Sequence, residues 1–133
     1  DTALRESLET LQTWVSEHRQ DAPAWLLLAQ TSDALGLQLR ALRAHAEARA
    51  AVGDLGAAID RLRAAQARSR TSAAGGDFIE ASVIDARLRE LLAQRRQLMA
   101  EMRGQRGGSA PRDDRGEDDR EASPGPAPGN RRL

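Results

Sequence analysis

Two glycines seventeen residues apart, Gly36 and Gly53, constrain the fold of this chain most strongly. Each ends one apolar helical pattern and is followed at once by the start of another, Leu37–Leu42 after the first and Asp54–Ile59 after the second. Glycine is the residue that most readily adopts the left-handed conformation in which many helices end. Two helix–turn–helix joints at this spacing predict helical hairpins that stack on one another as a short solenoid.

The apolar residues before Gly104 recur at intervals of three or four, which is the spacing of one face of an α-helix. This periodicity predicts helices over about 2–18, 22–35, 38–52, 55–68 and 77–103, with Asp21 and Asp54 as the N-caps of the second and the fourth. Aromatic residues make up only 2% of the chain, so Leu, Ala, Ile and Val must build the core. Few segments alternate with the period of two that a strand requires. We therefore expect an all-α domain at residues 1–103, with antiparallel helical hairpins closed by a long last helix.

The composition changes at Gly104, after which Gly, Pro, Ser, Asp, Glu and Arg dominate. Leu133 is the only large apolar residue of this stretch. A segment that buries so little apolar surface cannot offset the entropy lost on ordering. The sequence thus predicts a disordered tail at 104–133.

The charge balance and the missing cysteines exclude several classes of site. Twenty basic residues, all Arg, balance twenty acidic ones, so the chain has no general attraction to nucleic acid or to an anionic membrane. Without cysteine there is no disulfide, thiol nucleophile or Cys-ligated metal. No stretch approaches the roughly 20 apolar residues that span a bilayer.

The two histidines do not form a zinc motif. His18 and His45 are 27 residues apart on different predicted helices. A zinc protease needs two histidines one helical turn apart, a third ligand and a general base. No serine lies in a Gly-x-Ser-x-Gly sequence. We therefore expect no catalytic group, metal or cofactor in this chain.

The middle of the chain, roughly 21–68, resembles a tetratricopeptide (TPR) repeat, whose 34-residue period is twice the glycine spacing. Ser32 and His45 stand where aromatic residues are usual, and Gly53 where a proline is usual. The resemblance implies that Trp25 lies in the core. The residues that match the structural positions of the repeat are Trp25, Leu28, Ala29, Gly36, Ala41, Gly53 and Ala58.

The order of four phrases resembles a more specific family, the periplasmic zinc metalloproteases of the β-barrel assembly-enhancing type, in their C-terminal TPR region. The phrases lie at 21–29, 39–49, 53–66 and 78–89. In that family an N-terminal domain carries the His-Glu-x-x-His zinc helix. The TPR region packs against that domain and contacts the outer-membrane protein assembly machinery or its clients. The resemblance implies a periplasmic recognition module whose zinc and protease domain precede Asp1.

Three hypotheses of function are open. The first is a module that binds protein partners or unfolded client peptides, for which the TPR resemblance implies the groove residues Leu26, Gln30 and Asp33. The second is an autonomous oligomerisation or scaffold module, because the apolar residues from Ala81 to Met102 keep a heptad-like rhythm. The third is an enzyme, for which only the two histidines and scattered carboxylates could act as catalytic groups.

The charged residues of the last predicted helix are interpreted as structural. Asp77-Phe-Ile-Glu80 resembles a capping box, and Asp85 and Arg89 are spaced for an ion pair along the helix. The arginines at 87–103 are interpreted as a solvated face, since no aromatic residues accompany them for base stacking. Trp14 is predicted to lie at the domain edge or to face a preceding domain.

Overall fold

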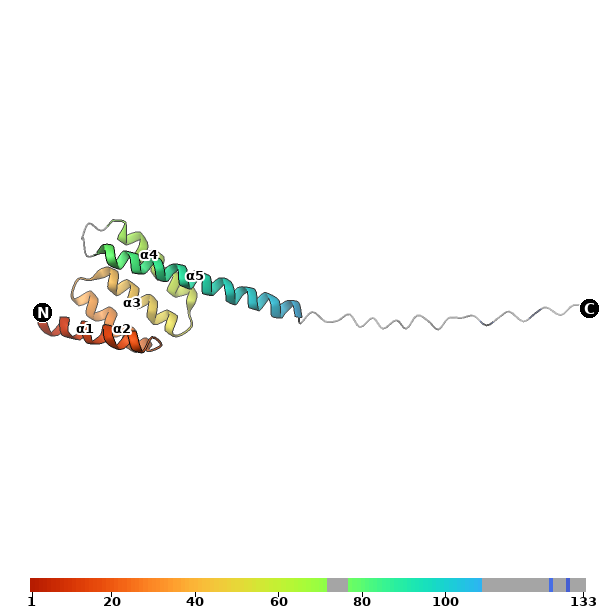
Figure 1. Cartoon of the computed structure of the whole chain (residues 1–133), viewed down its shortest axis with the longest axis horizontal. Coiled ribbons are helices and arrows are strands. Elements are labelled where there is room, and N and C mark those ends of the chain that lie inside the picture. Colours follow the sequence, from red (N-terminus) through yellow and green to blue (C-terminus); the bar gives the residue numbers. More distant parts are fainter. Residues whose placement is uncertain (72–76, 109–124, 126–128, 130–133) are drawn as a thin grey trace, which may run out of the picture.

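The computed structural model describes residues 1–71 and 77–108, together with Gly125 and Gly129. This described part contains five helices and no strand (Figure 1). The all-helical fold predicted from the periodicity is confirmed. The helices are α1 (Thr2–Glu17), α2 (Ala22–Ala34), α3 (Gln38–Ala51), α4 (Leu55–Ser69) and α5 (Asp77–Gly108).

The last helix differs from the prediction at its end. It continues past Arg103 to Gly108, so the first residues of the predicted tail are helical. Gln105 and Arg106 are good helix formers, and extending an existing helix carries no new nucleation cost. The rest of the predicted tail, apart from its two described glycines, lies outside the described residues, as do 72–76 of the predicted loop.

Gly36 and Gly53 end α2 and α3 with the same hydrogen-bonded turn. Their φ angles of +74° and +84° lie in the left-handed region that favours glycine. In each turn the residue after the glycine donates its N–H to a carbonyl five residues earlier in the chain. Leu37 donates to Ser32 over 2.8 Å, and Asp54 donates to Arg49 over 2.9 Å. This is the wide bond of a Schellman motif. The seventeen-residue spacing therefore marks two equivalent joints, as predicted.

Aspartates begin three of the helices. The carboxylates of Asp1, Asp21 and Asp54 each accept a backbone N–H of the first turn, over 3.0 to 3.1 Å. An N-cap aspartate satisfies a free N–H and places negative charge at the positive end of the helix dipole. The caps predicted at Asp21 and Asp54 are confirmed.

The helices pack in chain order, each against the next, and α3 is the central helix. Figure 1 shows α1 and α2 along one edge of the bundle, α4 and α5 along the other, and α3 between them. α3 also contacts α5 directly, whereas within residues 1–71 neither α1 and α3 nor α2 and α4 approach each other. This arrangement is compatible with the predicted short solenoid.

Two hydrophobic clusters share α3, whose small alanines let neighbouring helices approach closely on both sides. The first cluster joins α1, α2 and α3 through Leu8, Val15, Trp25, Leu28, Ala29, Ala44 and Ala48. The second joins α3, α4 and α5 through Leu39, Ala46, Ala58, Ile59, Leu62, Ala65, Ile84, Leu88 and Leu91. The chain thus has two layers of core, one on each side of α3.

The second half of α5 projects from the bundle (Figure 1). Leu91 is the last buried residue of this helix. Beyond it Leu98, Met99 and Met102 are 44%, 54% and 55% exposed. The projecting half is therefore a helix with an apolar stripe that the described part of the chain does not cover.

Candidate functional site

A groove lies between α1 and α3, because α2 separates the two helices and they do not contact each other. Two hollows of about 410 and 320 Å³ follow one another along it, and Gln12 of α1 lines both. The first hollow extends from Arg5 and has Arg40 on its α3 wall. The second extends to Arg19 and has Arg43 on its α3 wall. At 1.5 Å per helical residue the groove is roughly 20 Å long.

The floor of the groove is apolar. Trp25 and Leu28 of α2 and its C-cap residue Leu35 line it, beside Leu8 and Val15 of α1. All of these except Leu35 belong to the first hydrophobic cluster and are buried. Because the packing of the bundle already orders them, a bound segment would gain contact with the floor at little further entropic cost.

The rim of the groove is rich in arginine. Arg5, Arg19, Arg40 and Arg43 line the two hollows, and Glu9 is the only carboxylate that lines them. Within the described part of the chain, the guanidinium groups of Arg5 and Arg19 have no ion-pair or hydrogen-bond partner. A guanidinium offers a rigid fork of donors that matches a carboxylate. The rim is therefore positive, and part of that charge is unpaired.

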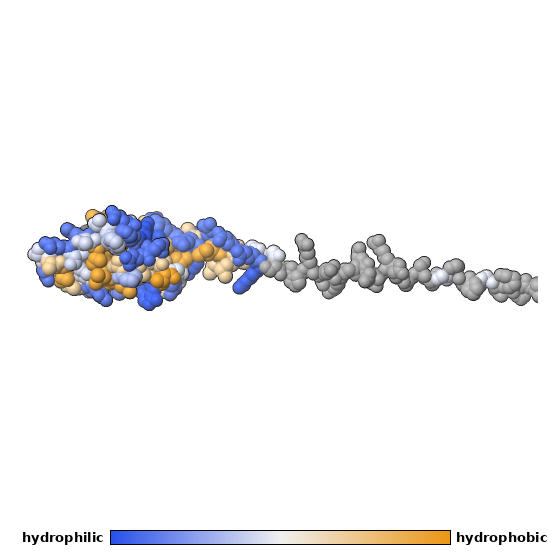
Figure 2. All heavy atoms as spheres, turned by 90° about the horizontal axis from the view of Figure 1, so that it is seen from below, coloured by the Kyte–Doolittle hydropathy of each residue, from blue (hydrophilic) through white to orange (hydrophobic). Residues whose placement is uncertain are grey.

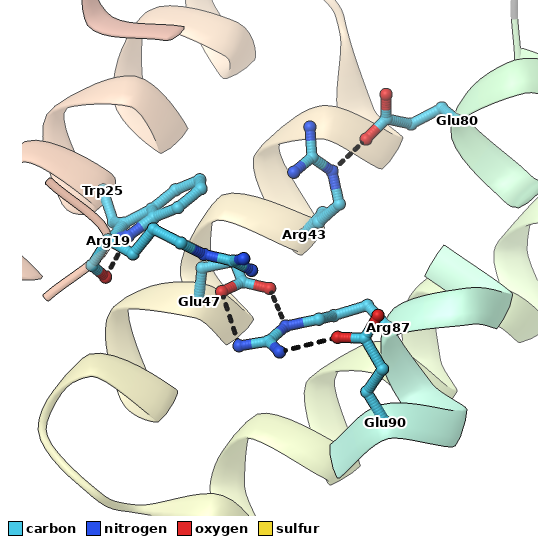
Figure 3. A network of polar contacts seen from close by, with 7 residues as sticks. All are labelled: Arg19, Trp25, Arg43, Glu47, Glu80, Arg87 and Glu90. Atoms are coloured by element: carbon cyan, nitrogen blue, oxygen red, sulfur yellow. Dashed lines mark hydrogen bonds and ion pairs between the residues drawn. The ribbon is translucent and has the colours of Figure 1, made fainter. Parts of the chain in front are cut away.

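Two tryptophans hold the end of the groove that Arg19 lines. The indole N–H of Trp25 donates to the backbone carbonyl of Arg19 over 3.0 Å. The indole N–H of Trp14 donates to the Asp21 carboxylate over 2.8 Å, and its ring stacks on His18 with centroids 3.7 Å apart. These contacts hold the turn between α1 and α2, and with it the position from which Arg19 extends. Figure 3 shows the bond between Trp25 and Arg19.

The same contacts act on the Asp21 carboxyl. The hydrogen bond from Trp14 is the main cause that lowers the pKa of Asp21 below its ordinary value, and the N–H of Ala24 and the nearby His18 act in the same direction. Trp14 is 46% exposed, at the edge of the bundle. Asp21 therefore stays ionised under ordinary conditions and keeps both its cap and its indole contact.

Ion pairs join α3 to α5 (Figure 3), beside a further hollow of about 290 Å³ that Glu47, Arg87 and Arg19 line. Arg87 of α5 binds both carboxylate oxygens of Glu47 on α3, over 2.5 and 3.1 Å. Glu80, at the start of α5, pairs with Arg43 and lies 3.7 Å from Arg40. The Glu47 side chain is only 5% exposed. These pairs join the two helices across the buried edge of the second cluster.

The chemistry of the Glu47–Arg87 pair is structural. Burial opposes the charged form of Arg87, but the hydrogen bonds and charge of Glu47 and Glu90 outweigh it and raise the pKa of Arg87 above its ordinary value. Glu90 contacts Arg87 from one turn along α5, over 3.0 Å. A guanidinium held so firmly in its charged form does not transfer protons. This pair therefore closes α5 against α3.

The groove residues that the TPR resemblance implies lie elsewhere. Leu26, Gln30 and Asp33 are exposed on α2, whereas Trp25 and Leu28 of the same helix form the floor of the groove. The two hollows are therefore not lined by the three implied residues. A part for Leu26, Gln30 and Asp33 in binding stays a prediction.

The residues matched to structural TPR positions are mostly buried. Gly36 and Gly53 occupy the two left-handed turns. Residues that are at most 5% exposed are Trp25, Leu28, Ala29, Ala41 and Ala58.

The structure also bears on metal-binding groups and on membrane-crossing helices. The described residues hold no group of three or more His, Cys, Asp or Glu side chains placed to bind a metal ion. His18 stacks on Trp14, and His45 is half-buried on α3. None of the described helices combines the length and the apolar character that a bilayer crossing demands.

Sequence reasoning missed the residues that close the α3–α5 side. The interpretation of the arginines at 87–103 as a solvated face is wrong for Arg87, whose side chain is only 20% exposed. A signal was present in the spacing. Glu80 lies four residues before Ile84 on the buried stripe of α5, and Glu47 stands between two buried alanines of α3. Charged residues inside an apolar stripe indicate a buried pair.

The ion pair predicted along α5 is also wrong. The Asp85 carboxylate accepts a 2.8 Å hydrogen bond from the side-chain amide of Gln66 on α4, and no ion pair joins it to Arg89 among the described residues. Helical spacing alone does not decide such a pair, because a neighbouring helix offers a competing partner.

Exposed apolar residues form a further feature of the surface. Figure 2 shows hydrophobic patches on the bundle, and again where the described part of α5 leaves it. On α2 the exposed large residues are Leu26 and Leu27, and on the projecting half of α5 they are Leu98, Met99 and Met102. The groove differs from these patches because it combines an apolar floor with a charged rim.

No protein-family model, curated protein or solved structure matches this chain.

Proposed function

We propose that this chain is a non-catalytic protein-binding module that holds a segment of a partner polypeptide in the groove between α1 and α3. The observation that carries this proposal is an apolar floor bordered by rim arginines, two of which have no partner among the described residues. A groove of this length accommodates about six residues of an extended chain at 3.3 Å each. Such a segment can place apolar side chains on the floor and polar ones at the rim.

The resemblance of the four phrases supports a more specific form of the proposal. In this form the chain is the C-terminal TPR part of a periplasmic zinc metalloprotease that acts in outer-membrane protein assembly and quality control. The zinc and the cleavage reaction belong to an N-terminal domain, and this chain supplies recognition. A His-Glu-x-x-His sequence encoded in frame upstream of Asp1 would support this form, whereas an in-frame stop directly before Asp1 would count against it.

Site-specific photo-crosslinking tests the binding function. A photoreactive residue replaces Gln12, where the two hollows meet. A matched control replaces Arg63, which is exposed on α4. The probe is an unfolded outer-membrane β-barrel protein diluted from urea. We expect adducts from position 12 and none from position 63, and equal yields at the two positions would contradict the proposal.

A third crosslinking position decides between the two surfaces of α2. A photoreactive residue at Leu26 samples the face that the TPR resemblance implies, which is exposed. Adducts from position 26 without adducts from position 12 would move the site from the groove to that face. The same incubations, supplied with zinc, also test for cleavage. We expect the client to keep its intact mass, because the chain contributes only binding.

One observation favours a second function, oligomerisation through the projecting half of α5. Leu98, Met99 and Met102 form an exposed apolar stripe there. Sedimentation of the chain tests this function, with Met102→Asp as the variant. Leu91 is buried in the second cluster, so a change at that position would report on folding. A dimer that Met102→Asp dissociates would establish this function, and a monomer at all concentrations would exclude it.

A further inference from the structure

The charges of the rim specify which segments the groove can hold. We infer that the groove selects acidic segments of partner proteins, in which carboxylates alternate with apolar side chains, and that Arg5 and Arg19 bind the carboxylates. This inference rests on the proposed function, because it names the chemistry of the bound segment.

Each hollow presents an arginine from both of its walls. In the first, Arg5 of α1 faces the hollow that Arg40 of α3 also lines. In the second, Arg19 of the turn after α1 and Arg43 of α3 line the hollow. A carboxylate that enters the first hollow therefore meets Arg5 and Arg40, and one that enters the second meets Arg19 beside an Arg43 that Glu80 already binds. Successive side chains of an extended segment point to opposite faces, so apolar residues can face the floor while acidic ones face the rim.

Among the described residues the positive charge of the rim is cancelled only in part, and Arg19 also lines the hollow beside Glu47. Glu80 takes up Arg43 and lies 3.7 Å from Arg40, whose side chain is still 41% exposed. Glu9 is the one acidic residue that lines either hollow. Arg5 and Arg19 keep unpaired guanidinium groups among the described residues. A carboxylate of a bound segment can accept two parallel hydrogen bonds from either of these guanidinium groups.

The floor favours a peptide over a nucleic acid. Single-stranded nucleic acid binds by stacking its bases on exposed aromatic faces, and the one aromatic residue of the floor, Trp25, is only 5% exposed. The chain has zero net charge, so it lacks the broad positive field that attracts a phosphate backbone. Aliphatic side chains such as Leu8, Val15 and Leu28 instead match the apolar residues of a peptide.

A pair of peptides that differ only in charge tests the inference. Both are fluorescent, about ten residues long and thus longer than the groove; Leu alternates with Glu in one and with Gln in the other. Fluorescence polarisation with the full chain measures the two affinities. We expect the Glu peptide to bind at least about tenfold more tightly at low salt, and the difference to shrink as salt screens the rim. Equal affinities would overturn the inference.

Variants of the rim identify the residues. Arg5→Gln combined with Arg19→Gln is compared with a control, Arg49→Gln combined with Arg63→Gln, which changes two exposed arginines outside the two hollows. We expect the rim variant to bind the Glu peptide about tenfold more weakly and the control to bind it as the parent does. Circular dichroism should show equal helicity for all three. A rim variant with parental affinity would overturn the assignment.

Two other occupants are outcomes of the same assay. Residues 113–121 of this chain contain six carboxylates. If that segment filled the groove, changing the six to amides would increase the affinity for the Glu peptide severalfold, which would overturn the inference. Tighter binding of a single-stranded RNA of equal length would do the same. Crosslinking at position 12 without charge discrimination would end this inference alone, whereas failure of crosslinking there would end the proposed function.

Discussion

The two sides of α3 are built alike but are not closed alike. On each side a helix packs directly on α3, namely α2 or α4, and a further helix packs on that one, namely α1 or α5. α5 also contacts α3, and Arg87 binds Glu47 across the contact. α1 does not contact α3, and the groove lies between these two helices.

The state of the arginines distinguishes a structural side from a binding side. Removing a charge from water costs free energy unless the charge is paired. Between α3 and α5, Arg87 and Glu47 are therefore stable only as a pair. Arg5 and Arg19 remain at a rim where solvent can hydrate them. Their charge is thus available to a partner. Whether the arginines are paired within the chain, more than how many there are, therefore distinguishes the α3–α5 contact from the groove.

Among the substitutions proposed here, the removal of Glu47 should have the largest effect on the free energy of unfolding. Glu47→Ala leaves Arg87 without its main partner in a place where its side chain is only 20% exposed. We expect a loss of about 3 kcal/mol or more in the free energy of unfolding. The matched change on the open side, Arg19→Ala, removes no internal ion pair and should alter this free energy by no more than about 0.5 kcal/mol. Urea unfolding followed by circular dichroism measures both.

A double variant controls for effects of Glu47 other than the ion pair. Glu47→Ala combined with Arg87→Ala removes both charges and should lose less stability than the sum of the two single losses, by about 1 to 3 kcal/mol. Additive losses would mean that the pair does not close the α3–α5 side. Equal losses for Glu47→Ala and Arg19→Ala would erase the proposed difference between the two sides.

Leucine-to-alanine substitutions on the two sides of α3 should also differ in the stability that they cost, but by less than the charge substitutions do. Leu62 is fully enclosed in the second cluster at 0% exposure, whereas Leu8, at 6%, also lines the groove. We expect Leu62→Ala to cost about 4 kcal/mol and Leu8→Ala about 2 kcal/mol, because water and neighbouring side chains can enter the space beside α1. The midpoints of urea unfolding compare the two. The reverse order would contradict an open first side.

The sequence predicted the helices well because their determinants are local. The apolar spacing, the N-caps at Asp21 and Asp54, and the left-handed turns at Gly36 and Gly53 each depend on a few neighbouring residues. The predicted end of α5 precedes the observed end at Gly108, because the composition changes before the helix ends.

The groove could not be predicted in the same way. It depends on how far α1 stands from α3, and no pattern within either helix encodes that distance. The resemblance directed attention to Leu26, whereas the hollows involve Arg5 and Arg19, which sequence alone shows only as two of twenty arginines. Glu80 and Arg87 were within reach of sequence reasoning, because both lie beside the buried stripe of α5.

The pH dependence of the turn at Asp21 should be the smallest effect, because this carboxylate is at the surface. Its pKa in the folded chain is lowered from the ordinary value of 3.8, mainly by the Trp14 hydrogen bond. A lowered carboxyl pKa contributes stability that is present above the ordinary pKa and is lost as pH falls through the folded one. We therefore expect Asp21→Asn to unfold at lower urea than the parent at pH 7, and the difference to narrow below about pH 4. In a Trp14→Phe background the same substitution should have less effect at pH 7, because the largest cause of the shift is gone. An undiminished effect in that background would mean that the turn which carries Arg19 is held by the N-cap alone, and that the indole does not help to hold the open side.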